Sequence, residues 1–394
     1  MLDPRNGFAS AFRAAFGLLV VVLAGCATDA SRNAAHAPDW ESPEAATVPA
    51  AALAPAVPAP TPPPPPPPTG PTNEATDTWV PLHRWCKAND LAAPCPLGLA
   101  PSPGYALSIT NGVFVLRTGL QLAYWNGVEL RLGFAPQMID GQPFLHALDL
   151  KKTLQPLIGG APMSFLRTNL TIVIDPGHGG DDAGTRSVLG NRYEREFTLD
   201  WARRLESLLA TNGWQVFLTR TNDIHLSLSN RIAFAEEHQA GLFLSLHFNS
   251  AAPNEHQAGL ETYCLTPTGM ASSVTRGYGD DPTMAYPNNA FDAENVQLAS
   301  WVHRALLQVN GWHDRGVRHA RYLGVLRGQN RPAILVEGGY LSNPLEARRI
   351  ADPAYRQKMA EAVAKALSEK TEIRSPKPQV ASREPTAGSR RAEN

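Results

Sequence analysis

The C-terminal half of the chain alternates between short apolar runs and longer stretches in which apolar residues recur at helical spacing. The strand-like runs are 171–174, 215–219, 242–246, 259–263 and 333–336, and the helix-like stretches are 194–210, 229–239, 295–309 and 354–368. Such alternation is typical of a parallel sheet covered by helices. The pattern therefore predicts a layered α/β domain with a mainly parallel sheet at about 170–368. A segment at 266–293, rich in Gly, Pro, Asp and Asn, predicts a surface loop within it.

Residues 77–160 show a different pattern of shorter runs. A short apolar cluster around Trp79, Leu82 and Trp85 favours a helix, and strand-like runs follow at 106–110, 113–116, 121–125 and 128–132. Asn-Gly and Asp-Gly pairs separate or follow these runs, and such pairs are typical of hairpin turns. The pattern predicts a small β-rich domain.

Residues 1–26 have the pattern of an export signal. Arg5 and Arg13 supply positive charge before a short apolar run that is too brief for a permanent transmembrane helix. The ending Leu-Ala-Gly-Cys26 resembles the lipobox of bacterial lipoproteins, which implies a lipidated Cys26 that anchors the chain to a membrane. The alternative is an ordinary cleaved signal with an incidental cysteine. Ala27 in the next position favours the outer over the inner membrane, so we expect a periplasmic location.

Two segments predict disorder. Residues 27–76 consist mainly of Ala, Pro, Thr and Ser and include an unbroken run of seven prolines at 62–68. Such a segment buries too little apolar surface to fold, and the proline run favours an extended polyproline II spacer. Residues 371–394 are polar and predict a disordered tail. The folded part is thus expected on a long proline-rich tether.

Composition and charge narrow the function. The 394 residues carry a net charge of −1, which gives no support to nucleic-acid binding. The four cysteines form no CxxC or Cys/His cluster, so a cysteine-based zinc site is not indicated. Cys86 and Cys95 lie nine residues apart in an exported chain and could form a disulfide or remain free.

Four polar residues occupy positions where an α/β fold places its ligands. His178 follows the first predicted strand, His247 ends another, and Glu337 ends a fourth apolar run, while Glu194 opens a helix. Ends of parallel strands meet at one edge of the sheet. Two imidazoles and one carboxylate are the ligand set of a catalytic zinc, and a second carboxylate can act as general base.

Spacing alone leaves other roles open. Glu194 could be an acid that favours a helix N-terminus, and His247 could be a core histidine. Glu337 follows four apolar residues with no adjacent cation, and a buried carboxylate needs a partner or a function. A functional role is therefore favoured for Glu337.

Six motifs resemble those of a known family. In order they are IDPGHGG at 174–180, EREFTL at 194–199, Thr219-Arg220 with Arg231, SLHFN at 245–249, RGVR at 315–318 and PAILVEGGYLSN at 332–343. Together they resemble the zinc-dependent N-acetylmuramoyl-L-alanine amidases of the division-amidase type, over about half of the chain. The resemblance implies a twisted mixed sheet flanked by helices.

The resemblance also implies a site. His178, Glu194 and His247 would bind one Zn²⁺, and Glu337 would be the catalytic acid and base. Glu196 lies near the second motif, but Glu194 holds the motif's first acidic position. The implied reaction is hydrolysis of the amide between N-acetylmuramic acid and L-alanine in peptidoglycan.

The chain departs from the best-known members of that family in one segment. Those members carry a long helical plug that an activator removes, whereas the corresponding segment here is a short polar loop at 270–289. Control by such a plug is therefore in doubt, although a protein activator remains an open alternative.

Two other functions compete with this hypothesis. One is a catalytically silent, peptidoglycan-binding lipoprotein of the same fold, and the other is a zinc hydrolase that acts on free peptides. Acidic residues at both 194 and 337 count against the first. A lipid anchor with a long tether counts against the second, because it favours a fixed polymer such as the cell wall as the substrate. A serine hydrolase finds no support, because the sequence has no GxSxG motif.

Overall fold

The computed structural model describes residues 78–98, 102–109, 111–159, 169–275, 280–311 and 313–372. The predicted export signal with Cys26, the proline-rich tether and nearly all of the predicted tail lie outside these residues. Within the described ranges, none of the helices combines the length and apolar character needed to cross a bilayer.

The C-terminal part is built on a mixed, mainly parallel sheet. Its strands are β9 (Thr171–Pro176), β10 (Gln215–Leu218), β11 (Leu242–Asn249), β12 (Leu260–Cys264), β13 (Asp314–His319) and β14 (Ala333–Tyr340). They lie in the order β10-β9-β11-β14-β12-β13, and only β12 and β14 pair antiparallel among them. The predicted fold class is confirmed.

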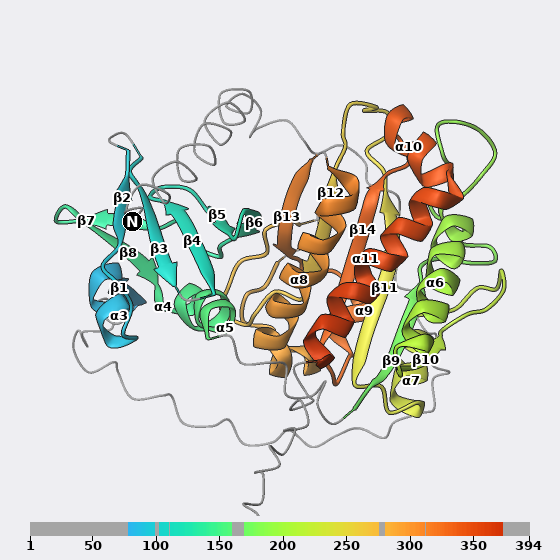
Figure 1. Ribbon diagram of the computed structural model, residues 1–394, viewed down its shortest axis with the longest axis horizontal. Helices are drawn as coiled ribbons and strands as arrows, with labels where there is room; N and C mark the ends of the chain where they lie inside the picture. The colour runs from blue at the N-terminus through green and yellow to red at the C-terminus, as the bar shows by residue number, and fades with distance from the viewer. Residues whose placement is uncertain are drawn as a thin grey trace, which may run out of the picture.

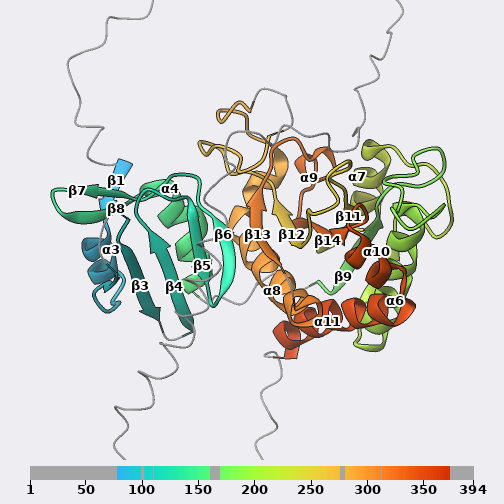
Figure 2. The same ribbon diagram turned by 90° about the horizontal axis from the view of Figure 1, so that it is seen from above.

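Helices cover both faces of this sheet (Figures 1 and 2). The helices are α6 (Glu194–Thr211), α7 (Leu228–Glu237), α8 (Asp292–Asn310), α9 (Gly324–Arg327), α10 (Pro344–Ala351) and α11 (Pro353–Glu372). Alternate strand residues pack on opposite faces: Ile172 and Val336 lie in the cluster with α6, α8 and α11, and Val173 lies in the cluster with α7 and α9. Burial on both faces explains why the strands read as continuous apolar runs.

The elements predicted for the C-terminal part recur with small shifts at their ends, but one strand of this part was missed. β13 has the sequence Asp-Arg-Gly-Val-Arg-His, in which only Val317 is apolar. This strand pairs on both sides, so its position is fixed by neighbours rather than by its own apolar pattern. The short helices α9 and α10 were not predicted either.

The N-terminal part is antiparallel. Its strands are β1 (Trp79–Pro81), β2 (Cys95–Leu97), β3 (Gly104–Ile109), β4 (Gly112–Arg117), β5 (Leu122–Trp125), β6 (Val128–Arg131), β7 (Gln137–Ile139) and β8 (Gln142–His146). Its helical segments are α3 (Leu82–Ala88), α4 (Ala147–Asp149), a π-helical turn (Leu150–Leu154) and α5 (Gln155–Ile158). Asn126 and Gly127 both have positive φ, as the two-residue hairpin between β5 and β6 requires.

The two parts share one sheet. β6 pairs parallel with β13 through Leu130 and Val317, so that β2–β6 continue the C-terminal sheet into eleven strands, while β1, β8 and β7 form a separate sheet (Figure 2). Asp314 reinforces the junction, because one oxygen accepts from the Glu129 amide at 2.8 Å and the other lies 2.9 Å from Nε2 of His303. The N-terminal part is thus joined to the C-terminal part by backbone pairing.

The disulfide considered for Cys86 and Cys95 is not formed, and both thiols are free. Cys86 lies in α3 and packs in the core beside Leu82 and Trp85, whereas Cys95 is exposed on β2. The two side chains therefore face different environments. Burial raises the pKa of the Cys86 thiol to about 11, which makes it a poor nucleophile.

The described residues of the predicted surface loop at 266–293 include buried positions and a short helix. Its last turn forms a 3-10 helix (Pro287–Phe291), and Asn288 is buried and donates to the Arg331 carbonyl at 2.8 Å. Because β12 runs antiparallel to β14, the segment leaves the sheet at the edge where β14 begins. That edge is opposite to the carboxyl ends of β9, β11 and β14.

His319, at the end of β13, provides a test of stability against pH. Burial lowers its pKa from 6.5 to about 4, so the folded state keeps the ring neutral while the unfolded chain takes up a proton below pH 6.5. Stability is therefore lost as pH falls from 6.5 towards 4. The effect between pH 7 and pH 5 is on the order of 2 kcal/mol.

We expect His319→Gln to lose less stability than the wild type between pH 7 and pH 5, measured by urea unfolding at each pH. His83→Gln, at an exposed position on α3, is the control and should behave as wild type. An unchanged pH dependence in His319→Gln would contradict this assignment.

Candidate metal and catalytic site

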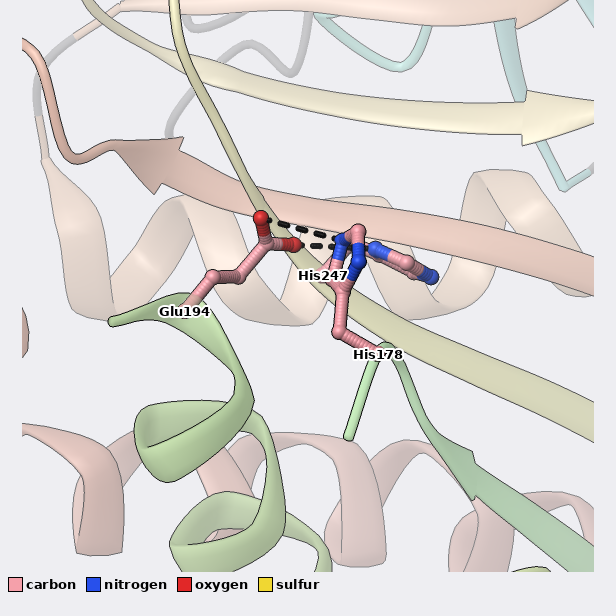
Figure 3. Close-up of side chains that lie close together, drawn as sticks. All are labelled: His178, Glu194 and His247. Carbon is pink, nitrogen blue, oxygen red and sulfur yellow. Dashed lines mark hydrogen bonds and ion pairs between the residues drawn. The ribbon is translucent and has the colours of Figure 1, made fainter. Parts of the chain in front are cut away.

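Three of the predicted residues meet at the carboxyl edge of the sheet (Figure 3). Glu194 contacts both imidazoles: one carboxylate oxygen is 2.9 Å from Nδ1 of His247 and the other is 3.1 Å from Nε2 of His178. All three side chains are buried, and one possible ligand atom from each lies within 4.8 Å of the others. Residues far apart in the sequence thus form one compact cluster.

His178 is placed by the tight turn after β9. Its backbone has φ of +61°, a left-handed conformation that residues other than Gly rarely adopt. Nδ1 of its ring lies 2.8 Å from both oxygens of Asp182, which holds the ring orientation and leaves Nε2 facing Glu194. A carboxylate behind a histidine is a common way to orient a metal ligand.

Glu194 is the first residue of α6, and backbone amides hold its carboxylate in place. The amides of Thr185 and Phe248 each donate to it at 3.0 Å, one to each oxygen. Glu196 does not join the cluster, because its carboxylate accepts from Arg192 and from the Tyr193 amide on an exposed part of the helix. The fold therefore brings Glu194, and not Glu196, to the histidines.

Glu337 lies beside this cluster on the neighbouring strand. Its position on β14 pairs in register with His247 on β11, and only 5% of Glu337 is exposed. The sequence placed both residues at strand ends, but β11 continues to Asn249 and β14 to Tyr340. The strands extend further because their pairing resumes at Asn249 and Tyr340 after a bulge.

The charges in the cluster depend on one another. Burial opposes a charge on His178, but Glu194 and Asp182 outweigh it and raise the pKa of His178 to about 10. Burial likewise opposes ionisation of Glu194, yet the two histidines hold the pKa of Glu194 far below its usual range. Burial lowers the pKa of His247. The pocket thus favours a positive charge between these side chains, which a proton or a metal cation can supply.

Two buried arginines hold the turn that carries His178, and the sequence pattern assigned them no role. Arg220 donates to the carbonyls of Pro176 and Gly177 at 2.9 and 2.8 Å. Arg231 donates to the His178 carbonyl at 3.0 Å and pairs with Asp175 at 2.6 Å. Their presence in a family motif was the only signal, because contacts to backbone carbonyls leave no pattern in the sequence.

The donor set fits a single divalent metal ion. Tetrahedral ligands at about 2.0–2.1 Å from a zinc ion lie roughly 3.3 Å from one another. The carboxylate of Glu194 lies 2.9 Å from His247 and 3.1 Å from His178, and one possible ligand atom from each residue lies within 4.8 Å of the others. The expected ligand spacing falls between these values, so a metal ion fits with small side-chain adjustments. Two nitrogen ligands and one oxygen ligand suit zinc among the common metals.

Comparisons with known proteins agree with this site. Residues 172–369 match the Amidase_3 family, described as N-acetylmuramoyl-L-alanine amidase. The chain is 26% identical over 261 residues to the amidase AmiA of Salmonella typhimurium, covering 60% of this chain and 89% of AmiA. It is 33% identical over 266 residues to the amidase LytC of Bacillus subtilis, covering 66% of this chain but only 47% of LytC.

Solved structures match about half of the chain. The catalytic domain of the amidase CwlV from Bacillus (Paenibacillus) polymyxa is 29% identical, with a TM-score of 0.43, and the match covers 52% of this chain and 98% of that one. The amidase AmiC2 of Nostoc punctiforme is 32% identical, with a TM-score of 0.42, covering 51% and 97%.

Gly177 provides a steric test of the cluster. A Cβ atom at this position would lie 2.2 Å from Cε1 of the His247 ring, so Gly177→Ala must displace the imidazole. A displacement of about 1 Å at a reacting centre can reduce the rate roughly 100-fold. We expect Gly177→Ala to fold, by circular dichroism, but to release peptide from peptidoglycan at least that much more slowly.

Gly324→Ala is the matched control. Its added Cβ would meet only the flexible end of Leu228, at the other edge of the sheet. Full activity in a folded Gly177→Ala protein would show that the position of His247 does not matter.

Proposed function

Because this chain belongs to the N-acetylmuramoyl-L-alanine amidase family and hydrolyses that amide bond in peptidoglycan, we propose that it does so with a zinc ion held by His178, Glu194 and His247. The observation that carries the proposal is the convergence of two imidazoles on one buried carboxylate, with Glu337 in register beside them. Zinc, when bound, would make a water molecule acidic enough to attack the amide and would polarise the carbonyl group.

Glu337 would act as the general base and then the general acid. Its carboxylate would take a proton from the attacking water and return it to the nitrogen of L-alanine as the bond breaks. Its paired position beside His247 supports this role, because cross-strand neighbours place their side chains on the same face of the sheet. Burial of Glu337 limits the competing access of bulk water.

Asp182, Arg220 and Arg231 would position the site without touching the substrate. Asp182 holds the His178 ring, and the two arginines hold the backbone on both sides of it. The alternative of a catalytically silent wall-binding lipoprotein is not favoured, since a binder has no need of Glu337 beside the cluster.

As a cell-wall amidase, the protein acts outside the cytoplasm. We further propose a periplasmic enzyme anchored in the outer membrane through lipidated Cys26, on the strength of the lipobox-like sequence. The domain limits from the sequence, 77–160 for the small domain and 170–368 for the catalytic domain, belong to this proposal. The proposal leaves room for a protein activator as a further partner.

Glu337→Gln separates metal binding from chemistry. The amide keeps the shape of the side chain but cannot accept the proton, so we expect bound zinc to stay near one ion per chain, by elemental analysis. Release of peptide from purified peptidoglycan should fall by a factor of roughly 100 to 10,000. Wild-type cleavage by the variant would exclude the proposed role of Glu337.

Substitutions in the cluster should act through the metal. We expect His178→Ala to lose both zinc and activity, and Asp182→Asn to bind zinc roughly 10- to 100-fold more weakly. A chelator should abolish activity and added zinc should restore it. Mass analysis of the released product should show an intact lactyl group on muramic acid and a free amino group on L-alanine. Activity that survives complete removal of zinc would refute a metal-dependent mechanism.

A further inference from the structure

A second buried carboxylate lies next to Glu337. Glu261 on β12 pairs in register with Glu337, so the Cβ atoms of the two residues lie about 5 Å apart on the same face. Glu261 is only 2% exposed and accepts from Asn249, Tyr263, Arg315 and Tyr340, at 3.0, 2.6, 2.6 and 3.1 Å respectively. Each oxygen of this carboxylate therefore accepts two hydrogen bonds, which hold it in place.

Two guanidinium groups meet this one carboxylate. Burial opposes ionisation of Glu261, but Arg318 and Arg315 hold its pKa below the usual value. All three nitrogens of the Arg315 guanidinium have partners. Nε donates to Glu261, and the two terminal nitrogens lie 2.8 and 2.6 Å from the side-chain oxygen of Gln257 when the Gln257 amide is oriented with its oxygen towards them. Its guanidinium also lies over the ring of Tyr340, at 5.5 Å.

Arg318 differs from Arg315 in the contacts of its terminal guanidinium nitrogens. Its Nε donates to the Arg315 carbonyl at 2.8 Å, and Nη1 is 3.7 Å from Glu261, a long ion pair. Within the described ranges, these are the hydrogen bond and the ion pair of its side chain, and 16% of that side chain is exposed. The guanidinium is therefore fixed at its base while its terminal nitrogens reach solvent.

Nearby acidic groups are already paired. Glu129 on β6 forms an ion pair with Arg131 at 2.9 Å. The oxygens of Asp314 accept from the amides of Glu129 and Gly316 and contact His303. A charge on Arg318 thus remains available to an anion from solvent.

The substrate carries an anion close to the scissile bond. In peptidoglycan, the second residue of the stem peptide is a D-glutamate linked through its side chain, so its α-carboxylate is free unless it is amidated. Two extended residues span about 7 Å from the scissile amide. Glu261 links the two groups, because it pairs in register with Glu337 and its carboxylate lies 3.7 Å from Nη1 of Arg318.

We propose that Arg318 binds the free carboxylate on the second residue of the stem peptide, with Glu261 and Arg315 holding the guanidinium in position. This inference rests on the proposed function, since it takes the scissile amide to lie between the metal ligands and Glu337. Arg318 is then a specificity residue that favours stems with a free carboxylate over amidated stems.

The test compares two soluble muropeptides that differ only in this group, one with the free carboxylate and one with the carboxamide. For the wild-type protein we expect kcat/KM to be at least roughly 10-fold higher for the acid, mainly through KM, because a charge-assisted hydrogen bond is lost in the amide. In Arg318→Gln the ratio should fall towards one. The amidated substrate should be cleaved with near wild-type kcat, and zinc content should not change.

Arg318→Lys keeps the charge and should give an intermediate ratio, so it tests the proposal if Arg318→Gln fails to fold. Arg304→Gln, at an exposed arginine on α8, should keep the full wild-type preference. Equal kcat/KM values for the two substrates in the wild type, or a preference that survives in a folded Arg318→Gln protein, would overturn the proposal. Failure of the proposed function would give a different result: the wild-type protein would cleave both muropeptides after zinc has been removed by a chelator.

Discussion

The candidate site depends on the buried carboxylate of Glu194, which touches both imidazoles at once. A buried carboxylate is stable only when charge and hydrogen bonds compensate it. Here the compensation comes from two backbone amides and two histidines that three different segments supply. The N-terminus of α6, the turn after β9 and the strand β11 must therefore all be in place before Glu194 is satisfied. Fold and site are coupled through this one group.

The parallel sheet supplies the second constraint. Pairing of β11 with β14 puts His247 beside Glu337, and pairing of β14 with β12 puts Glu261 next in the same row. A slip of one residue in either register would turn one of these side chains to the opposite face, among the helices α6, α8 and α11. The apolar residues that precede Glu337 on β14, such as Leu335 and Val336, are buried and fix the register. Core packing therefore sets the spacing of the polar groups that face the substrate.

Much of this arrangement could be predicted from the sequence. Apolar spacing located α6 and β14, and the motifs identified the four polar residues that the fold brings to one edge. Pattern reasoning failed where tertiary contacts decide: β13 has one apolar residue but two partner strands, and Cys86 is held in a core that Cys95 does not reach. The contacts of Arg220 and Arg231 with backbone carbonyls could not be foreseen, since such contacts depend on the path of the chain and not on residue type.

The pairing of β6 with β13 has a consequence for how the molecule behaves among other copies of itself. Without β6, the outer side of β13 would present unpaired backbone groups, which can recruit a strand from another chain. The N-terminal strands carry the sheet onward to β2, which has three residues and includes Pro96. A short strand with a proline is a poor template for further addition. The small N-terminal part thus moves this edge of the sheet from β13 to β2, where strand addition by a second copy of the chain is disfavoured.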